Sequence, residues 1–208
     1  MNHLISRTCI ALACVGALCQ QAALADSPAP RVEAPMATKV GGRFSYVDGA
    51  FLLKCNRWEV KEVANSAGLT VSKCGENTMY VTADAMNPVK AVNEDGKTVA
   101  SFTPFYPDLS FPLFVGKKWT GQYKGQKGIQ KWTSEVSCES AAFESVTTKA
   151  GKVDAFRIEC KDNWDAGIIF INGTKQSTRW YAPSVGLIVK SINEDSEWNI
   201  EVAGADWK

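Results

Sequence analysis

The chain has 208 residues, with 23 Lys and Arg against 22 Asp and Glu, and one histidine, His3. Its length fits one domain with a sizeable core, and its balanced charge gives no electrostatic reason to bind nucleic acid. Because His3 lies in a segment predicted to be removed, the mature chain excludes Ser-His-Asp and Cys-His catalysis, histidine metal sites and histidine proton shuttles.

Residues 1–25 are typical of a signal peptide. Arg7 provides the positive charge, residues 8–19 form an apolar run of 12, and a small-x-small cleavage site ends at Ala25. We therefore expect cleavage after Ala25 and a periplasmic or secreted bacterial protein. A transmembrane helix needs about 20 apolar residues, and no later run comes close. A lipid-attachment site at Cys14 is the alternative, although it would leave almost no apolar run before the cysteine.

Four cysteines remain after cleavage, and in an oxidising compartment they predict two disulfides with three connectivities. None belongs to a C-x-x-C pair, which argues against zinc and thioredoxin-like sites. Side-chain alternation places Cys138 and Cys160 on apolar strand faces, and Cys55 and Cys74 on polar faces. Because successive side chains point to opposite faces of a sheet, like should pair with like. We therefore predict the bridges Cys55–Cys74 and Cys138–Cys160.

Residues 26–40, with three prolines and no periodic pattern, are predicted to form a flexible linker. From Gly41 onward no window of 11 residues has a helical pattern, whereas short alternating or β-branched runs predict strands. Residues 103–112 interrupt these runs with three prolines, and because proline cannot donate to a strand ladder they predict a connector. The predicted strands before it are 43–47, 57–64, 68–73, 78–82, 89–93 and 97–102, and those after it are 118–124, 130–138, 143–149, 152–161, 166–171, 174–181, 187–192 and 197–203.

Turn residues join the later strands. Asn172 and Gly173 predict a two-residue hairpin turn after 166–171, because both central residues of a type I′ turn need positive φ. Similar turns at 150–151 and 193–196 predict an antiparallel meander over 143–203.

The fold class predicted from these runs is all-β. We expect one antiparallel meander over 41–208 that forms a strongly curved sheet, half-barrel or sandwich, stapled by two disulfides. The connector leaves 41–102 and 113–208 as candidate halves, and the Trp-led strands near Trp58 and Trp132 leave an internal duplication open.

Two late patterns carry a resemblance to a known family. A W-Y-x-P-x-x-G-x-x-V-K pattern is matched by Trp180, Tyr181, Pro183, Gly186, Val189 and Lys190. The hairpin before it contains Gly151, Asp154, Ala155, Phe156 and Ile158. Over about residues 111–192 the chain resembles exported bacterial β-proteins of unknown function. The resemblance implies a curved sheet or half-barrel similar to periplasmic lipoprotein carriers and other lipid-binding shells, and it supplies no catalytic residues.

The aromatic residues allow two interpretations each. Trp180 and Tyr181 either plug one end of the core or form an aromatic patch at the mouth of a cavity. Among the seven tryptophans, Trp58, Trp119 and Trp132 are expected in the core. The surface candidates, which leave carbohydrate binding open, are Trp164, Trp198 and Trp207.

The predicted strand over 168–171 is apolar on both faces, with three isoleucines and Phe170. Such a strand must be covered on two sides. Either a second layer or the connector, through Phe105, Tyr106 and Phe111, covers it, or it is an open surface for an apolar ligand or partner.

Carboxylates offer the one enzymatic hypothesis. Asp162 and Asp165 flank Trp164, and Glu159 precedes them, as a glycosidase-like acid and base would require. The same residues are ordinary turn chemistry, and no known catalytic or calcium-loop motif is present. We therefore expect no enzyme activity, no cofactor and no metal.

The function predicted from the sequence is that of a non-catalytic exported β-shell, which binds an apolar small molecule, lipid or other envelope component. The alternatives are an envelope structural or interaction protein that docks through the apolar strand, and a carboxylate-dependent polysaccharide hydrolase. The oligomeric state stays open. The expected ligand contacts are Ile169, Phe170, Ile171, Trp164, Trp180, Tyr181, Phe105 and Tyr106.

Overall fold

A computed structural model describes residues 30–50 and 52–206; the predicted signal peptide and Trp207 lie outside them. Within these residues, antiparallel strands and one short 3₁₀ helix, η1 (Ser196–Trp198), make up the fold. No described helix has the length and apolar character needed to cross a membrane. The strands are β1 (Arg43–Tyr46), β2 (Arg57–Glu62), β3 (Leu69–Cys74), β4 (Asn77–Thr82), β5 (Pro88–Val92), β6 (Thr98–Thr103), β7 (Lys118–Lys127), β8 (Gln130–Thr148), β9 (Gly151–Asp165), β10 (Asn172–Ala182), β11 (Leu187–Asn193) and β12 (Ile200–Asp206).

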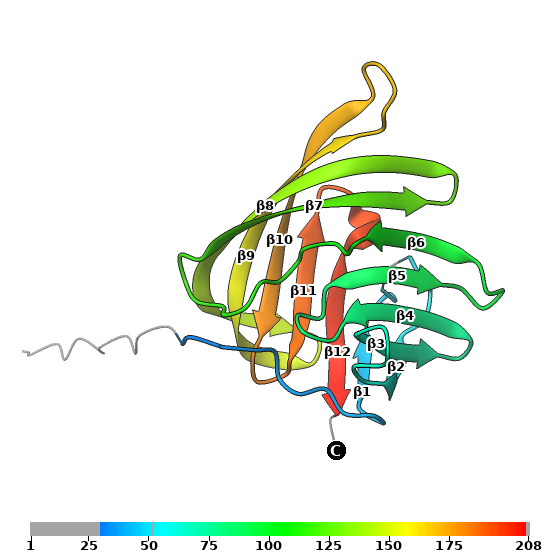
Figure 1. Ribbon diagram of the computed structural model, residues 1–208. Helices are drawn as coiled ribbons and strands as arrows, with labels where there is room; N and C mark the ends of the chain where they lie inside the picture. Colours follow the sequence, from blue (N-terminus) through cyan, green and yellow to red (C-terminus); the bar gives the residue numbers. More distant parts are fainter. Residues whose placement is uncertain (1–29, 51, 207–208) are drawn as a thin grey trace, which may run out of the picture.

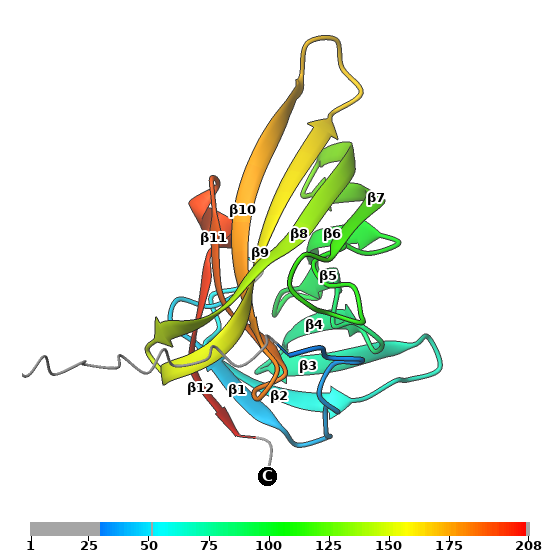
Figure 2. The same cartoon turned by 90° about the vertical axis from the view of Figure 1, so that its left-hand side faces the viewer.

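These twelve described strands form a closed barrel in which each pairs with its neighbours along the chain (Figures 1 and 2). The barrel closes where β1 pairs with β12, with Phe44 opposite Ala205. The all-β antiparallel prediction is therefore confirmed, but the sheet closes rather than stopping at a half-barrel or a sandwich. The strands of the two candidate halves, β1–β6 and β7–β12, belong to one continuous sheet, because β6 pairs with β7.

Two predicted strands, 130–138 and 143–149, merge into the single strand β8, which bends at a register shift between Ser140 and Ala142. β8, β9 and β10 are longer than the other strands, and the β9–β10 hairpin rises above the rest of the barrel (Figure 1). The barrel wall formed by β8, β9 and β10 is therefore taller than the rest, at the end of the barrel where the β9–β10 hairpin projects.

The predicted strand 166–171 is wrong: these residues are the loop between β9 and β10, named here the hairpin tip. The predicted turn at Asn172 and Gly173 is wrong as well, because both residues pair with β9. Gly173 serves packing instead, since a Cβ there would lie 3.1 Å from the indole nitrogen of Trp164. The positive φ angles that reverse the chain belong to Gly167 and Phe170.

The barrel interior holds the core, with Trp58, Val60 and Val202 almost fully buried. Part of the predicted linker packs against the barrel, because Val32 and Leu113 exchange two backbone hydrogen bonds of 2.7 and 2.9 Å. Met36 lies under Gly186, where a Cβ would come within 2.9 Å of the methionine Cβ. Residues 30–40 therefore lie along the barrel rather than forming a free linker.

Both predicted disulfides are present, Cys55–Cys74 and Cys138–Cys160. Cys138 and Cys160 are directly opposite each other on β8 and β9, on the interior face, as their apolar parity predicts. The polar-face assignment of Cys74 is wrong, because Cys74 is buried together with Thr70 and Ser72 of the same strand. The predicted Cys55–Cys74 pairing is confirmed, but the argument for it is wrong in one part: polar side chains of β3 point into the barrel interior instead of towards solvent.

Candidate functional site

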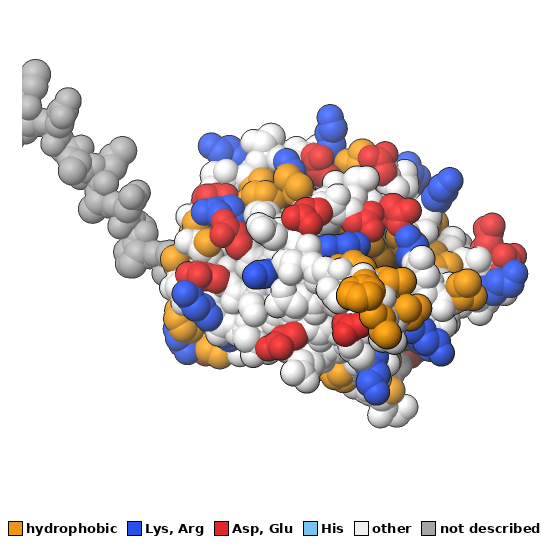
Figure 3. Space-filling model, turned by 90° about the horizontal axis from the view of Figure 1, so that it is seen from above, with side chains coloured by type: hydrophobic (Ala, Val, Ile, Leu, Met, Phe, Trp, Pro, Cys, Tyr) orange, Lys and Arg blue, Asp and Glu red, His pale blue; other side chains and the backbone are white. Residues whose placement is uncertain are grey.

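A cavity of about 710 Å³ occupies the barrel interior and reaches the hairpin tip. Its size lies in the range of small-molecule sites. Figure 3 looks down on this end, where apolar side chains gather beside charged ones. The apolar part of the wall comes from strands all around the barrel: Phe44, Tyr46, Met79, Val81, Phe102, Leu187 and Ile188.

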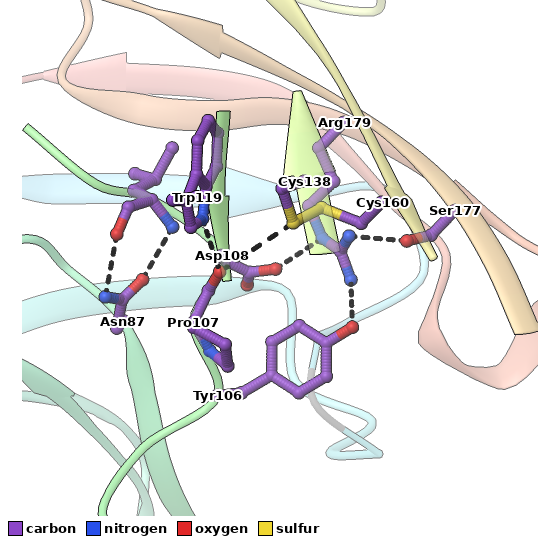
Figure 4. Close-up of a disulfide and its surroundings, with 10 residues drawn as sticks. Asn87, Tyr106, Pro107, Asp108, Trp119, Cys138, Cys160, Ser177 and Arg179 are labelled. Carbon is purple, nitrogen blue, oxygen red and sulfur yellow. Dashed lines mark hydrogen bonds and ion pairs between the residues drawn. A yellow bond between two sulfur atoms is a disulfide. The ribbon is translucent and has the colours of Figure 1, made fainter. Parts of the chain in front are cut away.

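The connector between β6 and β7 crosses the barrel interior and supplies Tyr106, Asp108 and Leu109 to the cavity lining. Asn87 fixes it, donating to the Leu109 carbonyl at 3.0 Å and accepting from the Leu109 N–H at 2.8 Å. The Pro107 carbonyl accepts a hydrogen bond of 3.1 Å from Trp119 Nε1 (Figure 4). The connector is thus an ordered internal wall, as its prolines alone do not reveal.

A buried ion pair ties the connector to β10. Arg179 Nε lies 2.5 Å from Asp108 Oδ1, and both side chains are less than a tenth exposed. Arg179 also donates to Ser177 Oγ at 2.5 Å and to the Tyr106 hydroxyl at 3.2 Å (Figure 4). Each nitrogen of the guanidinium therefore has a protein partner, and Arg179 serves to hold the connector.

Burial and neighbouring charges shift the pKa values of both Asp108 and Arg179. Burial raises the pKa of the Asp108 carboxyl, and the Arg179 guanidinium opposes that rise. Burial also lowers the pKa of Arg179, but the Asp108 carboxylate, Tyr106 and Asp162 together outweigh that effect and hold the pKa above its usual range. Arg179 therefore stays charged, and Asp108 is the member of the pair whose charge is costly.

A second polar group projects from the wall formed by β7, β8 and β9. Asp162 accepts hydrogen bonds from the Tyr123 hydroxyl at 2.7 Å and from Ser134 Oγ at 2.6 Å. Trp132 Nε1 donates to the Tyr123 oxygen at 3.2 Å. Burial raises the pKa of Tyr123 far above its ordinary value, and raises that of Tyr106 to about 12. Both phenols therefore stay protonated and neutral, and with Asp162 and Ser134 they form a polar band within an apolar cavity.

The predicted ligand contacts divide into three groups. Trp164, Ile171 and Tyr106 line the cavity. Ile169 and Phe170 lie at the hairpin tip with 80% and 93% of their surface exposed, so the connector does not cover them.

The remaining predicted contacts lie away from the cavity. Trp180 donates to Glu144 at 2.8 Å, and Tyr181 is fully buried against Phe111. Phe105 is half-buried and outside the lining. The structure therefore does not bring the Trp180–Tyr181 pair to the mouth.

Sequence reasoning missed the wall residues of β1 and β4, the partner of Arg179 and the Tyr123 group. One signal was available: Arg179 shares the strand parity of the core residue Tyr181, and a charge on an apolar face needs a buried partner. Nothing in the local sequence points from Arg179 to Asp108, because the two meet only when the connector enters the barrel.

The three carboxylates of the hydrolase hypothesis do not share one cleft. Asp162 faces the cavity, whereas Glu159 and Asp165 have the opposite parity on β9 and are exposed. Glu159 pairs with Arg157, and Asp165 accepts a 2.7 Å hydrogen bond from the Gly167 N–H. Within the part of the chain that the structure describes, no three His, Cys, Asp or Glu side chains are grouped to hold a metal ion.

No protein-family model matches the chain, and neither does any curated protein. Among solved structures, it is similar to the hypothetical lipoprotein YmcC from Escherichia coli K12, with 11% identity and a TM-score of 0.48 over 75% of this chain and 80% of that one. A candidate lipoprotein from Parabacteroides distasonis and a candidate exported protein with a YmcC-like fold from Bacteroides fragilis each give 14% identity and a TM-score of 0.46. Both comparisons cover 84% of this chain and 99% of the other.

Proposed function

We propose that this protein is a non-catalytic exported shell that binds an apolar or amphiphilic envelope-derived ligand inside its barrel. The cavity of about 710 Å³, walled by aliphatic and aromatic side chains, carries the proposal. Two disulfides support the export that the N-terminal sequence predicts, because such bonds persist in oxidising compartments.

The polar band suggests what kind of ligand fits. The charge of Arg179 is paired with Asp108, and its two other nitrogens donate to Ser177 and Tyr106, so the cavity offers no unpaired guanidinium to an anionic group. Asp162 brings a carboxylate to the lining. We expect an amphiphile with an apolar chain and a neutral or cationic polar group.

A cavity-filling substitution tests the proposal. Ser72 lines the cavity, and Ser72→Phe should occupy part of its volume. The matched control, Ser137→Phe, adds the same side chain on the exposed face of β8. Titration with the fluorescent probe N-phenyl-1-naphthylamine should show saturable binding to the wild type and the control, and about tenfold weaker binding to Ser72→Phe.

Thermal melts followed by circular dichroism confirm that both variants are folded. Absence of saturable probe binding in the wild type, or equal affinities in all three proteins, would reject the cavity as the ligand site. Native mass spectrometry of protein purified from its own envelope then identifies the retained molecule.

A further inference from the structure

The hairpin tip gathers exposed apolar side chains at the mouth of the cavity. Of nine large hydrophobic side chains exposed among the described residues, four lie on the tip, Ile168, Ile169, Phe170 and Ile171, and a fifth, Ile129, lies across the mouth. Ile129, in the β7–β8 turn, is 98% exposed. Figure 3 shows the apolar patch on this end of the molecule. Contiguous exposed patches of this kind mark binding surfaces.

The backbone of the tip is ordered without help from these side chains. The Ala166 N–H donates to the Ile171 carbonyl at 2.9 Å, and the Ile171 N–H donates to the Ile168 carbonyl at 2.9 Å. Asp165 accepts from the Gly167 N–H. The loop therefore closes on its own main chain, while the side chains of Ile169 and Phe170 are 80% and 93% exposed.

Phe170 is unfavourable for folding on two counts. Its φ of 68° lies in the left-handed region, where glycine or asparagine is favoured and a bulky side chain is strained. Its ring is almost fully exposed to water. Its position and exposure are what a residue with a contact outside the chain would show.

The apolar surface continues from the tip into the cavity. Ile168 and Ile171 line the cavity, as does Ile129 across the mouth, while Ile169 and Phe170 project from the same loop into solvent. An apolar molecule can therefore pass along this surface with little exposure to water.

We propose that the hairpin tip docks the mouth of the barrel onto a lipid surface, with Ile169 and Phe170 inserted among the acyl chains. This inference rests on the proposed function, since the docked mouth is the entrance for the cavity ligand. A stable protein–protein interface uses about 20–30 residues from each partner, far more than this narrow loop provides. Insertion into lipid needs only a few apolar side chains.

Charges at the rim give the docking no preference for lipid charge. Lys175 pairs with Asp195 at 3.5 Å, and Lys127 pairs with Glu197. Lys131 lines the mouth as well, and so do Glu194 and Asp195. Because charges of both signs lie at the rim, the apolar side chains drive the interaction. Binding is therefore expected on zwitterionic lipid as well as on anionic lipid, with little dependence on salt.

Vesicle flotation of the purified exported protein tests this proposal. Wild type should float with phosphatidylcholine vesicles, with and without added phosphatidylglycerol, and Phe170→Asn should reduce the bound fraction about tenfold, as expected for losing one inserted aromatic side chain. The double variant Ile169→Asn/Phe170→Asn should lose binding. The matched control Val40→Asn removes an exposed apolar side chain just before β1 that does not line the cavity, and it should float like wild type.

Probe binding without vesicles separates the two proposals. If the tip variants bind N-phenyl-1-naphthylamine like wild type but no longer float, both the cavity and the docking surface are supported. A wild type that binds the probe but never floats overturns the docking and leaves the cavity standing. Undiminished flotation of the double variant also overturns it, as does a wild-type dimer in analytical ultracentrifugation that Phe170→Asn dissociates, because the tip would then bind a second copy.

Discussion

Two apolar loops of this protein join neighbouring strands and end in opposite environments. The middle of the connector between β6 and β7, Pro107 to Leu109, is buried inside the barrel, whereas the hairpin tip between β9 and β10 is largely exposed. The backbone of the connector forms hydrogen bonds with Asn87 and Trp119, and its Asp108 carboxylate forms an ion pair with Arg179. The tip closes its hydrogen bonds on itself.

The difference shows that apolar composition alone does not decide which loop is buried. A loop that enters a core must have its polar groups satisfied there, and the connector meets this condition through residues of three different strands or their flanks. The tip has no such requirement. One loop therefore builds the internal wall of the cavity, and the other is free to serve as its entrance.

The largest expected effect comes from breaking the buried ion pair. Asp108→Ala leaves the Arg179 charge buried without its partner and should lower the free energy of unfolding by about 3–5 kcal/mol. Urea denaturation followed by circular dichroism measures it. Glu159→Ala, which removes the exposed partner of Arg157, should cost less than about 1 kcal/mol.

A rescue variant checks the reason for that loss. Asp108→Leu combined with Arg179→Met removes both charges and should recover most of the stability, because an apolar pair needs no desolvation. Equal effects of Asp108→Ala and Glu159→Ala would show that the connector does not depend on the pair.

An intermediate effect is expected at alkaline pH. Burial raises the pKa of Tyr106, in the connector, and of Tyr181 to about 12, against about 10 in the unfolded chain. Because the unfolded chain loses the protons first, stability is complete below about pH 10 and falls towards pH 12 by up to about 1.4 kcal/mol per pH unit for each tyrosine.

Urea melts between pH 8 and 11.5 measure this slope. Tyr106→Phe removes one titrating group and should make the decline shallower, while Phe170→Asn at the tip should leave it unchanged. A Tyr106→Phe slope identical to that of wild type would contradict burial of the connector.

The smallest expected effect concerns charges at the tip. Ile169→Asp and Phe170→Asp should each change stability by no more than about 0.5 kcal/mol, because both side chains are exposed. Leu109→Asp places the same charge in the buried connector and should cost several kcal/mol. Thermal melts compare the three, and a large loss at either tip position would mean that the tip is packed.

Much of the fold could be predicted from the sequence. Alternating runs identified most strands, and strand parity together with cysteine number predicted both disulfides. The prediction of a strand over 166–171 is wrong, because an apolar run has the same sequence pattern in a buried strand and in an exposed loop. The predicted turn at Gly173 is wrong for a related reason. This glycine leaves room for the Trp164 ring, and residue spacing in the sequence does not reveal that contact.

Apart from Tyr106, the residues of the candidate site that the sequence predicted lie close together in the chain, at the β9–β10 hairpin. Trp164 and Ile171 were expected near a ligand and do line the cavity, but the wall residues Phe44 and Met79 come from strands far away in sequence. No local pattern could join them to the same interior.

The sequence by itself determined the strand periodicity and the disulfide pairing, and it is the basis for the predicted export signal and for the absence of histidine from the predicted mature chain, because each is a property of composition or short spacing. Tertiary structure alone decided that β1 meets β12 to close the barrel, that Asp108 reaches Arg179, and that Phe170 remains in water. These outcomes depend on contacts between distant segments, and the geometry of the closed barrel fixes which of those segments meet.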